Sequence, residues 1–120
     1  MKKDELKKVY ARCEEENTDP VIFGDGNPDA SILLVGEAPG AKEIEQGKPF
    51  VGQAGKNLDD FLKILALERE DIYITNVVKF RPYRINEKTG KKVNRPPNKQ
   101  EIEKHVKYLQ EEIKIIQPKI

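Results

Sequence analysis

The chain has 120 residues, of which 37% are hydrophobic and 36% are charged, and its formal net charge is +1. This length suffices for a single domain with its own core and leaves no room for a second. No apolar run approaches the roughly 20 residues of a membrane-spanning helix, and the Met-Lys-Lys-Asp-Glu start lacks the apolar core of a signal peptide. Because Cys13 has no second cysteine to pair with, we expect a reducing, cytoplasmic environment.

The first half of the chain shows one helical and two strand-like patterns. Apolar residues at helical spacing predict an amphipathic helix over residues 3–16, namely Leu6, Val9, Tyr10 and Cys13. A short strand is predicted at residues 21–23, ended by the turn-forming residues 24–28. The continuous apolar run at residues 31–35 predicts a fully buried strand. An open loop rich in glycine, proline and acidic residues is predicted to follow it over residues 36–52.

The second half repeats the alternation. Leucines and a phenylalanine at helical spacing predict a helix over residues 54–66, and the β-branched run at residues 71–78 predicts a second strand. The last helix is predicted to begin at an N-cap pair of Asn98 and Glu101 and to run to Pro118. Alternating helices and strands predict one three-layer α/β/α domain over residues 1–120, with a short, mainly parallel sheet.

Basic residues are concentrated in the segment between the second strand and the last helix. Over residues 77–99 a single acid, Glu87, stands against Lys79, Arg81, Arg84, Lys88, Lys91, Lys92, Arg95 and Lys99. A basic loop, here residues 79–99, on an otherwise acidic chain is typical of a polyanion contact, most simply a nucleic-acid backbone. From charge alone, a solvated loop without a partner is an equal alternative.

Two polar residues follow the predicted core strands. Glu37 comes directly after the first strand, and Asn76 lies near the carboxyl end of the second. Ligands of α/β proteins bind beyond the carboxyl ends of the strands. If the two strands are parallel neighbours, we expect both side chains at the same rim of the sheet.

Several stretches resemble motifs of the family 4 uracil-DNA glycosylases, and the resemblance runs from about residue 6 to residue 120. The first stretch is Gly36-Glu37-Ala38-Pro39-Gly40, followed by Glu43 and by Gly47-Lys48-Pro49-Phe50-Val51-Gly52-Gln53-Ala54-Gly55. The second is Ile74-Thr75-Asn76-Val77-Val78-Lys79. Arg81-Pro82 and Asn94-Arg95-Pro96-Pro97 are similar to the loop that follows, here lengthened by residues 83–93.

The resemblance implies hydrolysis of the N-glycosidic bond of a flipped-out uracil in DNA, the first step of base excision repair. Phe50 is then the platform on which the base stacks, with core packing as the alternative. Asn76 reads the base edge by donating to O4 and accepting from N3–H, with backbone capping as the alternative. Glu37 is the catalytic carboxylate, which stabilises positive charge on the sugar or orients the attacking water. The family also places Gly36 and Ala38 against uracil, and Glu43 at its C5 edge.

In the basic loop, the resemblance implies sequence-independent contacts with DNA phosphates. The residues expected to make them are Lys79, Arg81, Arg84, Lys91, Lys92 and Arg95.

The chain departs from the family pattern at the cofactor. Family 4 enzymes typically hold an iron–sulfur cluster through four cysteines. Cys13 matches the first of these positions, whereas Glu16, Phe80 and His105 occupy the others. We therefore expect no cluster and no other metal. We expect packing by Phe80 to replace the structural role of the cluster.

The second departure concerns the length. Family members continue into further β/α units that carry a His-Pro motif, whose histidine hydrogen-bonds uracil O2. This sequence stops before them, which indicates either a fragment or a naturally shortened gene. We expect glycosylase activity to be weakened or absent, and self-association through an unpaired strand edge.

Two alternatives to a glycosylase remain open. The first is a non-catalytic remnant that binds DNA and uracil without cleaving the glycosidic bond. The second is a small nucleotide-binding domain. It ranks last because the loop after the first strand has no phosphate-binding glycine motif and is flanked by acids.

Overall fold

The computed structural model describes residues 1–120 as one mixed α/β domain. Its helices are α1 (Lys2–Glu16), α2 (Ala41–Gln46), α3 (Gln53–Ile64) and α4 (Lys99–Ile116), with a short 3₁₀ turn at Arg69–Asp71. Its strands are β1 (Asp25–Gly26), β2 (Leu33–Gly36), β3 (Tyr73–Asn76), β4 (Tyr83–Ile85) and β5 (Lys92–Asn94). None of the helices is long and apolar enough to cross a membrane.

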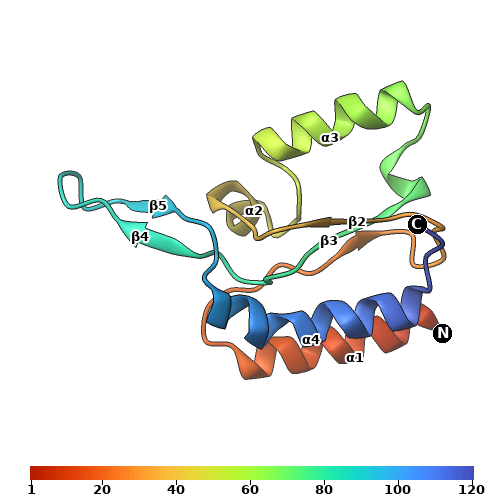
Figure 1. Cartoon of the computed structure of the whole chain (residues 1–120), viewed down its shortest axis with the longest axis horizontal. Coiled ribbons are helices and arrows are strands. Elements are labelled where there is room, and N and C mark those ends of the chain that lie inside the picture. Colours follow the sequence, from red (N-terminus) through yellow and green to blue (C-terminus); the bar gives the residue numbers. More distant parts are fainter.

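A three-stranded sheet forms the middle layer, in the order β1-β3-β2. Strands β2 and β3 are parallel, whereas the short β1 pairs antiparallel with β3. Helix α3 lies on one face of this sheet, and α1 and α4 lie side by side on the other (Figure 1). The predicted three-layer α/β/α class is confirmed, with a mixed sheet.

Each face of the sheet has its own hydrophobic core. The larger core lies beneath it and joins α1, α4 and the sheet through Leu6, Val9, Tyr10, Cys13, Ala30, Tyr73, Tyr108 and Ile116. The smaller core lies beneath α3 and consists of Leu58, Leu62, Ile72 and Ile74. Because successive side chains of a strand point to opposite faces, the wholly buried β3 supplies both cores.

The strand predicted at residues 21–23 is wrong. Val21 forms only an isolated bridge with Phe80, and the strand that pairs with β3 lies further along the chain, at Asp25–Gly26. Gly26 has φ +118°, and a Cβ there would clash with the carbonyl oxygen of Ile72. The turn-like glycine is thus what lets the backbone approach β3 closely enough to pair.

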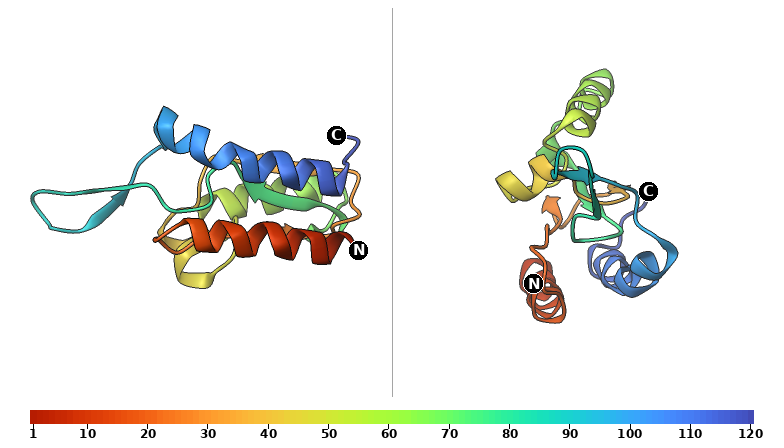
Figure 2. Two further views of the ribbon diagram at one scale, coloured as in Figure 1. Left: turned by 90° about the horizontal axis from the view of Figure 1, so that it is seen from below. Right: turned by 90° about the vertical axis from the view of Figure 1, so that its left-hand side faces the viewer.

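Two segments predicted as loops contain regular structure. The stretch after β2 includes the short helix α2, and the basic segment folds into the β4–β5 hairpin. This hairpin projects from the body of the domain (Figure 2). The predicted N-cap of α4 is confirmed, since Asn98 Oδ1 accepts from the Glu101 amide at 2.8 Å and Glu101 Oε1 accepts from the Asn98 amide at 2.9 Å.

Candidate uracil-binding site at the carboxyl ends of β2 and β3

The carboxyl ends of β2 and β3 lie side by side. Gly36 is in register with Asn76, and the Val77 amide donates to the Gly36 carbonyl at 2.9 Å. The Val78 amide donates to the Glu37 carbonyl at 3.0 Å, so the pairing continues past the strands. The register therefore brings the backbones of Glu37 and Asn76 to one rim of the sheet.

Gly36, Phe50 and Asn76 meet at this rim. A Cβ at residue 36 would clash with Oδ1 of Asn76 and lie 2.6 Å from Cζ of Phe50. Asn76 is buried on β3, and Phe50 is half-buried above it. An aromatic ring, a buried amide and an open backbone thus converge where a planar base needs a stacking face and an edge reader.

Arg69, which the sequence motifs do not identify, holds the Phe50 backbone. Phe50 has φ +55°, an unfavourable conformation for a residue with a side chain. Arg69 Nη2 donates to the Phe50 carbonyl at 2.7 Å, and Arg69 Nε pairs with Asp59 Oδ1 at 2.9 Å. Gly55 packs so tightly beneath this carbonyl that a Cβ would clash with it. These contacts stabilise a loop conformation that costs about 1–3 kcal/mol by itself.

Glu43 holds the loop together from the other side. Its carboxylate accepts hydrogen bonds from the amides of Gly40 at 2.8 Å, Val51 at 3.0 Å and Gly52 at 2.9 Å. Burial by itself would raise the pKa of Glu43, but these backbone hydrogen bonds outweigh it and lower the pKa below its ordinary value. This is an observed structural role, and the expected contact with the base edge stays a prediction.

Glu37 and Ala38 line an open cavity of about 550 Å³ beside this rim. Glu43 also lines it, and Asn94 and Arg95 close it from the base of the hairpin. Gly36, Phe50 and Asn76 are not among its lining residues. The structure therefore places the exposed Glu37 between a cavity bordered by the hairpin and the narrow space at the ends of the strands.

The predicted phosphate contacts separate into three groups. Arg84, Lys91 and Lys92 are exposed on the hairpin. Arg81 and Arg95 are half-buried, the first donating to Asn94 Oδ1 at 2.6 Å and the second forming a bidentate pair with Glu101 at 2.7 and 2.9 Å. Hydrogen bonding to Glu101 raises the pKa of Arg95, so this guanidinium stays charged. Lys79 forms the third group by itself.

The assignment of Lys79 to the DNA backbone is wrong. Its side chain is completely buried and forms an ion pair with Glu112 on α4. The reason is its place in the chain: residue 79 lies just past the end of β3, and its side chain turns under the sheet rather than out toward solvent.

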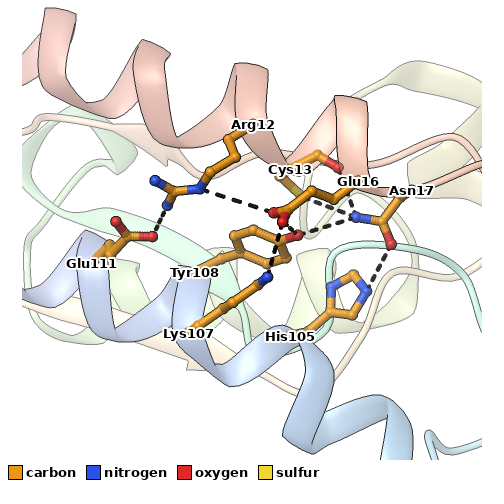
Figure 3. A network of polar contacts seen from close by, with 8 residues as sticks. All are labelled: Arg12, Cys13, Glu16, Asn17, His105, Lys107, Tyr108 and Glu111. Atoms are coloured by element: carbon orange, nitrogen blue, oxygen red, sulfur yellow. Dashed lines mark hydrogen bonds and ion pairs between the residues drawn. The ribbon is translucent and has the colours of Figure 1, made fainter.

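Three of the four positions of the family's cluster cysteines, Cys13, Glu16 and His105, lie at the contact between α1 and α4 (Figure 3). His105 Nδ1 accepts from the Lys79 amide at 3.1 Å, and its Nε2 pairs with Asn17 Oδ1 at 3.1 Å. The Phe80 ring packs on His105 with a centroid distance of 5.1 Å. Glu16 accepts from the Tyr108 hydroxyl at 2.7 Å.

These residues do not fit an iron–sulfur cluster. Such clusters are normally held by thiolates, and Cys13 is the only cysteine. Burial raises the pKa of its thiol to about 11, which disfavours the thiolate. Both nitrogens of His105 already have partners, and Phe80 offers no donor atom.

Comparison with known proteins identifies the family. The model of the Uracil DNA glycosylase superfamily matches residues 23–120. The chain belongs to this superfamily. Among its relatives is a type-4 uracil-DNA glycosylase of Sulfurisphaera tokodaii, 49% identical over 100 residues, which are 82% of this chain and 41% of that protein.

Two further type-4 uracil-DNA glycosylases support the resemblance to family 4. The protein of Pyrobaculum aerophilum is 44% identical over 98 residues, which are 82% of this chain and 45% of that protein. The protein of Thermotoga maritima is 38% identical over 117 residues, which are 98% of this chain and 56% of that protein. The chain thus spans about half the length of the curated relatives that it matches.

Proposed function

We propose that this chain carries the uracil-recognition half of a uracil-DNA glycosylase that acts in base excision repair. The observation that supports it best is the meeting of Gly36, Phe50 and Asn76 at the ends of two parallel strands. The relatives named above are uracil-DNA glycosylases.

The proposed recognition uses a base that has left the DNA stack. Phe50 stacks on its face, while the Asn76 amide donates to O4 and accepts from N3–H. Cytosine has the reverse donor and acceptor pattern at this edge, so an amide held in one orientation rejects it. Gly36 and Ala38 supply the close backbone approach, and Glu43 faces the C5 edge.

Glu37 is the proposed catalytic carboxylate. Breaking the bond between C1′ and N1 builds positive charge on the sugar, and an adjacent carboxylate stabilises that charge or orients the water that attacks C1′. Its exposed position beside an open cavity of about 550 Å³ supports either role, because both sugar and water have access to it.

The hairpin is the proposed contact with the DNA backbone. Arg84, Lys91 and Lys92 are exposed there, and Arg81 and Arg95 lie where it joins the body. We propose further that the domain works without an iron–sulfur cluster, with the hydrogen bonds of His105 and the ring of Phe80 joining α1, α4 and the end of β3 instead. The cytoplasmic location stays a prediction.

A uracil-DNA binder that does not cleave the base is the second candidate. It is favoured by one observation: Glu37 lines a cavity to which neither Phe50 nor Asn76 contributes. Binding requires Phe50, Asn76 and the basic hairpin, whereas cleavage also requires Glu37.

The deciding experiment is an abasic-site assay on an oligonucleotide that contains one uracil, with binding measured in parallel. The matched variants are Glu37→Ala, Asn76→Ala and, as a control, Glu45→Ala, because Glu45 is an exposed acid on the neighbouring helix α2. Abasic product that is lost in the first two variants and kept in the control supports the glycosylase. Uracil-dependent binding without product supports the binder, and binding that ignores uracil contradicts both.

A further inference from the structure

Lys79 and Glu112 form an ion pair inside the domain, and the side chains of both are 0% exposed. Removing two charges from water carries a large free-energy penalty, and apolar residues of similar volume often serve stability equally well. A buried ion pair is therefore weak evidence that the pair stabilises the fold. Its other contacts indicate which part of the structure it holds in place.

Every polar side-chain atom of this pair has a partner. Besides Glu112 Oε1, Lys79 Nζ donates to Thr75 Oγ1 at 2.6 Å and to the Asn76 carbonyl at 2.5 Å. The second oxygen of Glu112 accepts from the Thr75 hydroxyl at 2.9 Å and from the Tyr10 hydroxyl at 2.6 Å. The network therefore joins α1, β3 and α4 through directional hydrogen bonds rather than through apolar contacts.

The network binds β3 at Asn76, on the face of the sheet opposite to the Asn76 side chain. Thr75 points toward α4, whereas the next side chain, that of Asn76, points to the opposite face, where it meets Phe50. The ammonium binds both the Thr75 side chain and the Asn76 main chain, so it fixes the peptide that carries the amide. A second contact to α4, from the Lys79 amide to His105 Nδ1 at 3.1 Å, fixes the residue that supplies the ammonium.

We propose that the Lys79–Glu112 pair is a positioning device for Asn76 and thereby sets the preference for uracil over cytosine. This inference rests on the proposed function, because it assumes that Asn76 reads the base. The pair never touches the base, and it acts by holding the peptide of Asn76 in one orientation. Discrimination between the two bases depends on that position, because an amide displaced from the base edge loses the hydrogen-bond distances and angles that distinguish a donor from an acceptor.

The test separates orientation from stability. Lys79→Met alone leaves the Glu112 carboxylate buried without a cation, so it is expected to destabilise the fold. The informative variant is therefore Lys79→Met/Glu112→Leu, which replaces the pair by apolar side chains. Thr75→Val, nearly isosteric, is a second variant that removes only the hydroxyl. Lys107→Ala, which removes the exposed pair with Glu16, is the control.

All variants are made in a Glu37→Gln background so that bound uracil is retained. For each, the thermal midpoint is measured together with the affinities for oligonucleotides that contain one uracil or one cytosine at the same place. We expect the double variant to melt within a few degrees of its parent while its uracil-to-cytosine preference falls by about tenfold. Thr75→Val should lose part of the preference, and the control none.

A double variant or Thr75→Val variant that folds and keeps the full preference overturns the proposal. A parent that shows no preference for uracil contradicts the proposed function instead. In that case the NMR signals of the Asn76 side-chain amide decide the positioning role alone. Signals that move or broaden in the double variant but not in Lys107→Ala support it, and unchanged signals overturn it.

Discussion

At the scale of single residues, the candidate site depends on a missing side chain, at Gly36, as much as on the side chains that are present. Gly36 leaves free the space between the Asn76 amide and the Phe50 ring that a single methyl group would fill. Phe50 keeps its unusual backbone because Arg69 and Gly55 surround its carbonyl. Small changes at these positions should therefore affect base binding more than they affect folding.

Gly36→Ala is predicted to abolish the preference for uracil over cytosine and to destabilise the domain by about 1–3 kcal/mol, the usual cost of overpacking. The new methyl group would press on Asn76 Oδ1 and Phe50 Cζ. The measurement is binding to uracil- and cytosine-containing oligonucleotides beside a urea titration. Gly90→Ala is the control, because it strains a positive φ of +71° in open space between β4 and β5 and should lose stability without losing the preference for uracil.

His105 is predicted to make the domain less stable in mild acid. Burial, with help from Lys104 and Lys79, lowers the pKa of His105 to about 4, against 6.5 for an ordinary histidine. Between these values the unfolded chain binds a proton that the folded chain does not. The stability contributed by the neutral ring is complete above the higher value and is lost as the pH falls toward the lower one.

Urea titrations at intervals from pH 7 to pH 4 test this linkage. The free energy of unfolding should fall by up to about 1.4 kcal/mol per pH unit because of this group. His105→Gln removes the titration and should flatten the slope relative to the parent over the same range. Equal slopes in the two proteins would contradict a buried neutral histidine.

At the scale of elements, the β4–β5 hairpin and α4 have different structural roles. The hairpin carries exposed cations away from the body, whereas α4 uses Glu112 and His105 to hold the end of β3 from below. Arg95 joins the two elements through Glu101, a member of the α4 capping pair. The hairpin is thus anchored to the helix that supports the reading residue.

The hairpin is predicted to supply salt-dependent, sequence-independent affinity. Arg84→Ala and Lys91→Ala should each weaken DNA binding, and the slope of log affinity against log salt should become shallower by about 0.7 to 0.9 for each phosphate that is no longer neutralised. The ratio between uracil and cytosine should not change. Lys8→Ala, on the exposed face of α1, is the control of equal charge. Slopes that are the same in all three variants would remove the hairpin from the DNA interface.

At the scale of the whole molecule, the outer edge of β2 is only partly paired. The last residues of the chain pair with the start of this edge: the Ile120 amide donates to the Ser31 carbonyl at 3.0 Å, and the Leu33 amide donates to the Ile120 carbonyl at 3.0 Å. Beyond that point Val35, 44% exposed, lies on the edge with no neighbouring strand. An apolar strand edge of this kind favours pairing with another chain.

We therefore predict that the protein associates with itself through β2. Sedimentation velocity over a range of concentrations should show dimers or larger species, because an added strand satisfies the free backbone groups of the edge. Val35→Lys places a charge there and should shift the distribution toward monomer. A parent protein that sediments as a monomer throughout that range would contradict the prediction.

Local patterns of the sequence determined most of the elements. Residues 3–16, 54–66 and 98–118 have the periodicity or the caps of helices, and helices are found there within a few residues. The run at residues 31–35 overlaps β2, which is partly exposed rather than fully buried as predicted, and the run at residues 71–78 contains β3. These signals are local, since apolar spacing and capping depend on neighbours a few residues away. The resemblance of residues 36–55 and 74–79 to family motifs likewise indicates the superfamily from the sequence by itself.

Only the tertiary structure decided which side chains face which surroundings. Lys79 lies in a basic segment and, from charge alone, belongs with its exposed neighbours, yet it is buried because Glu112, 33 positions further along the chain, lies beneath the end of β3. The contact of Arg69 with Phe50 and the pairing of Gly26 with β3 likewise join segments that are separated in the sequence. Whether a side chain is buried, and which residues it contacts, depends on segments that are distant in the sequence. The local pattern around a residue therefore predicts neither.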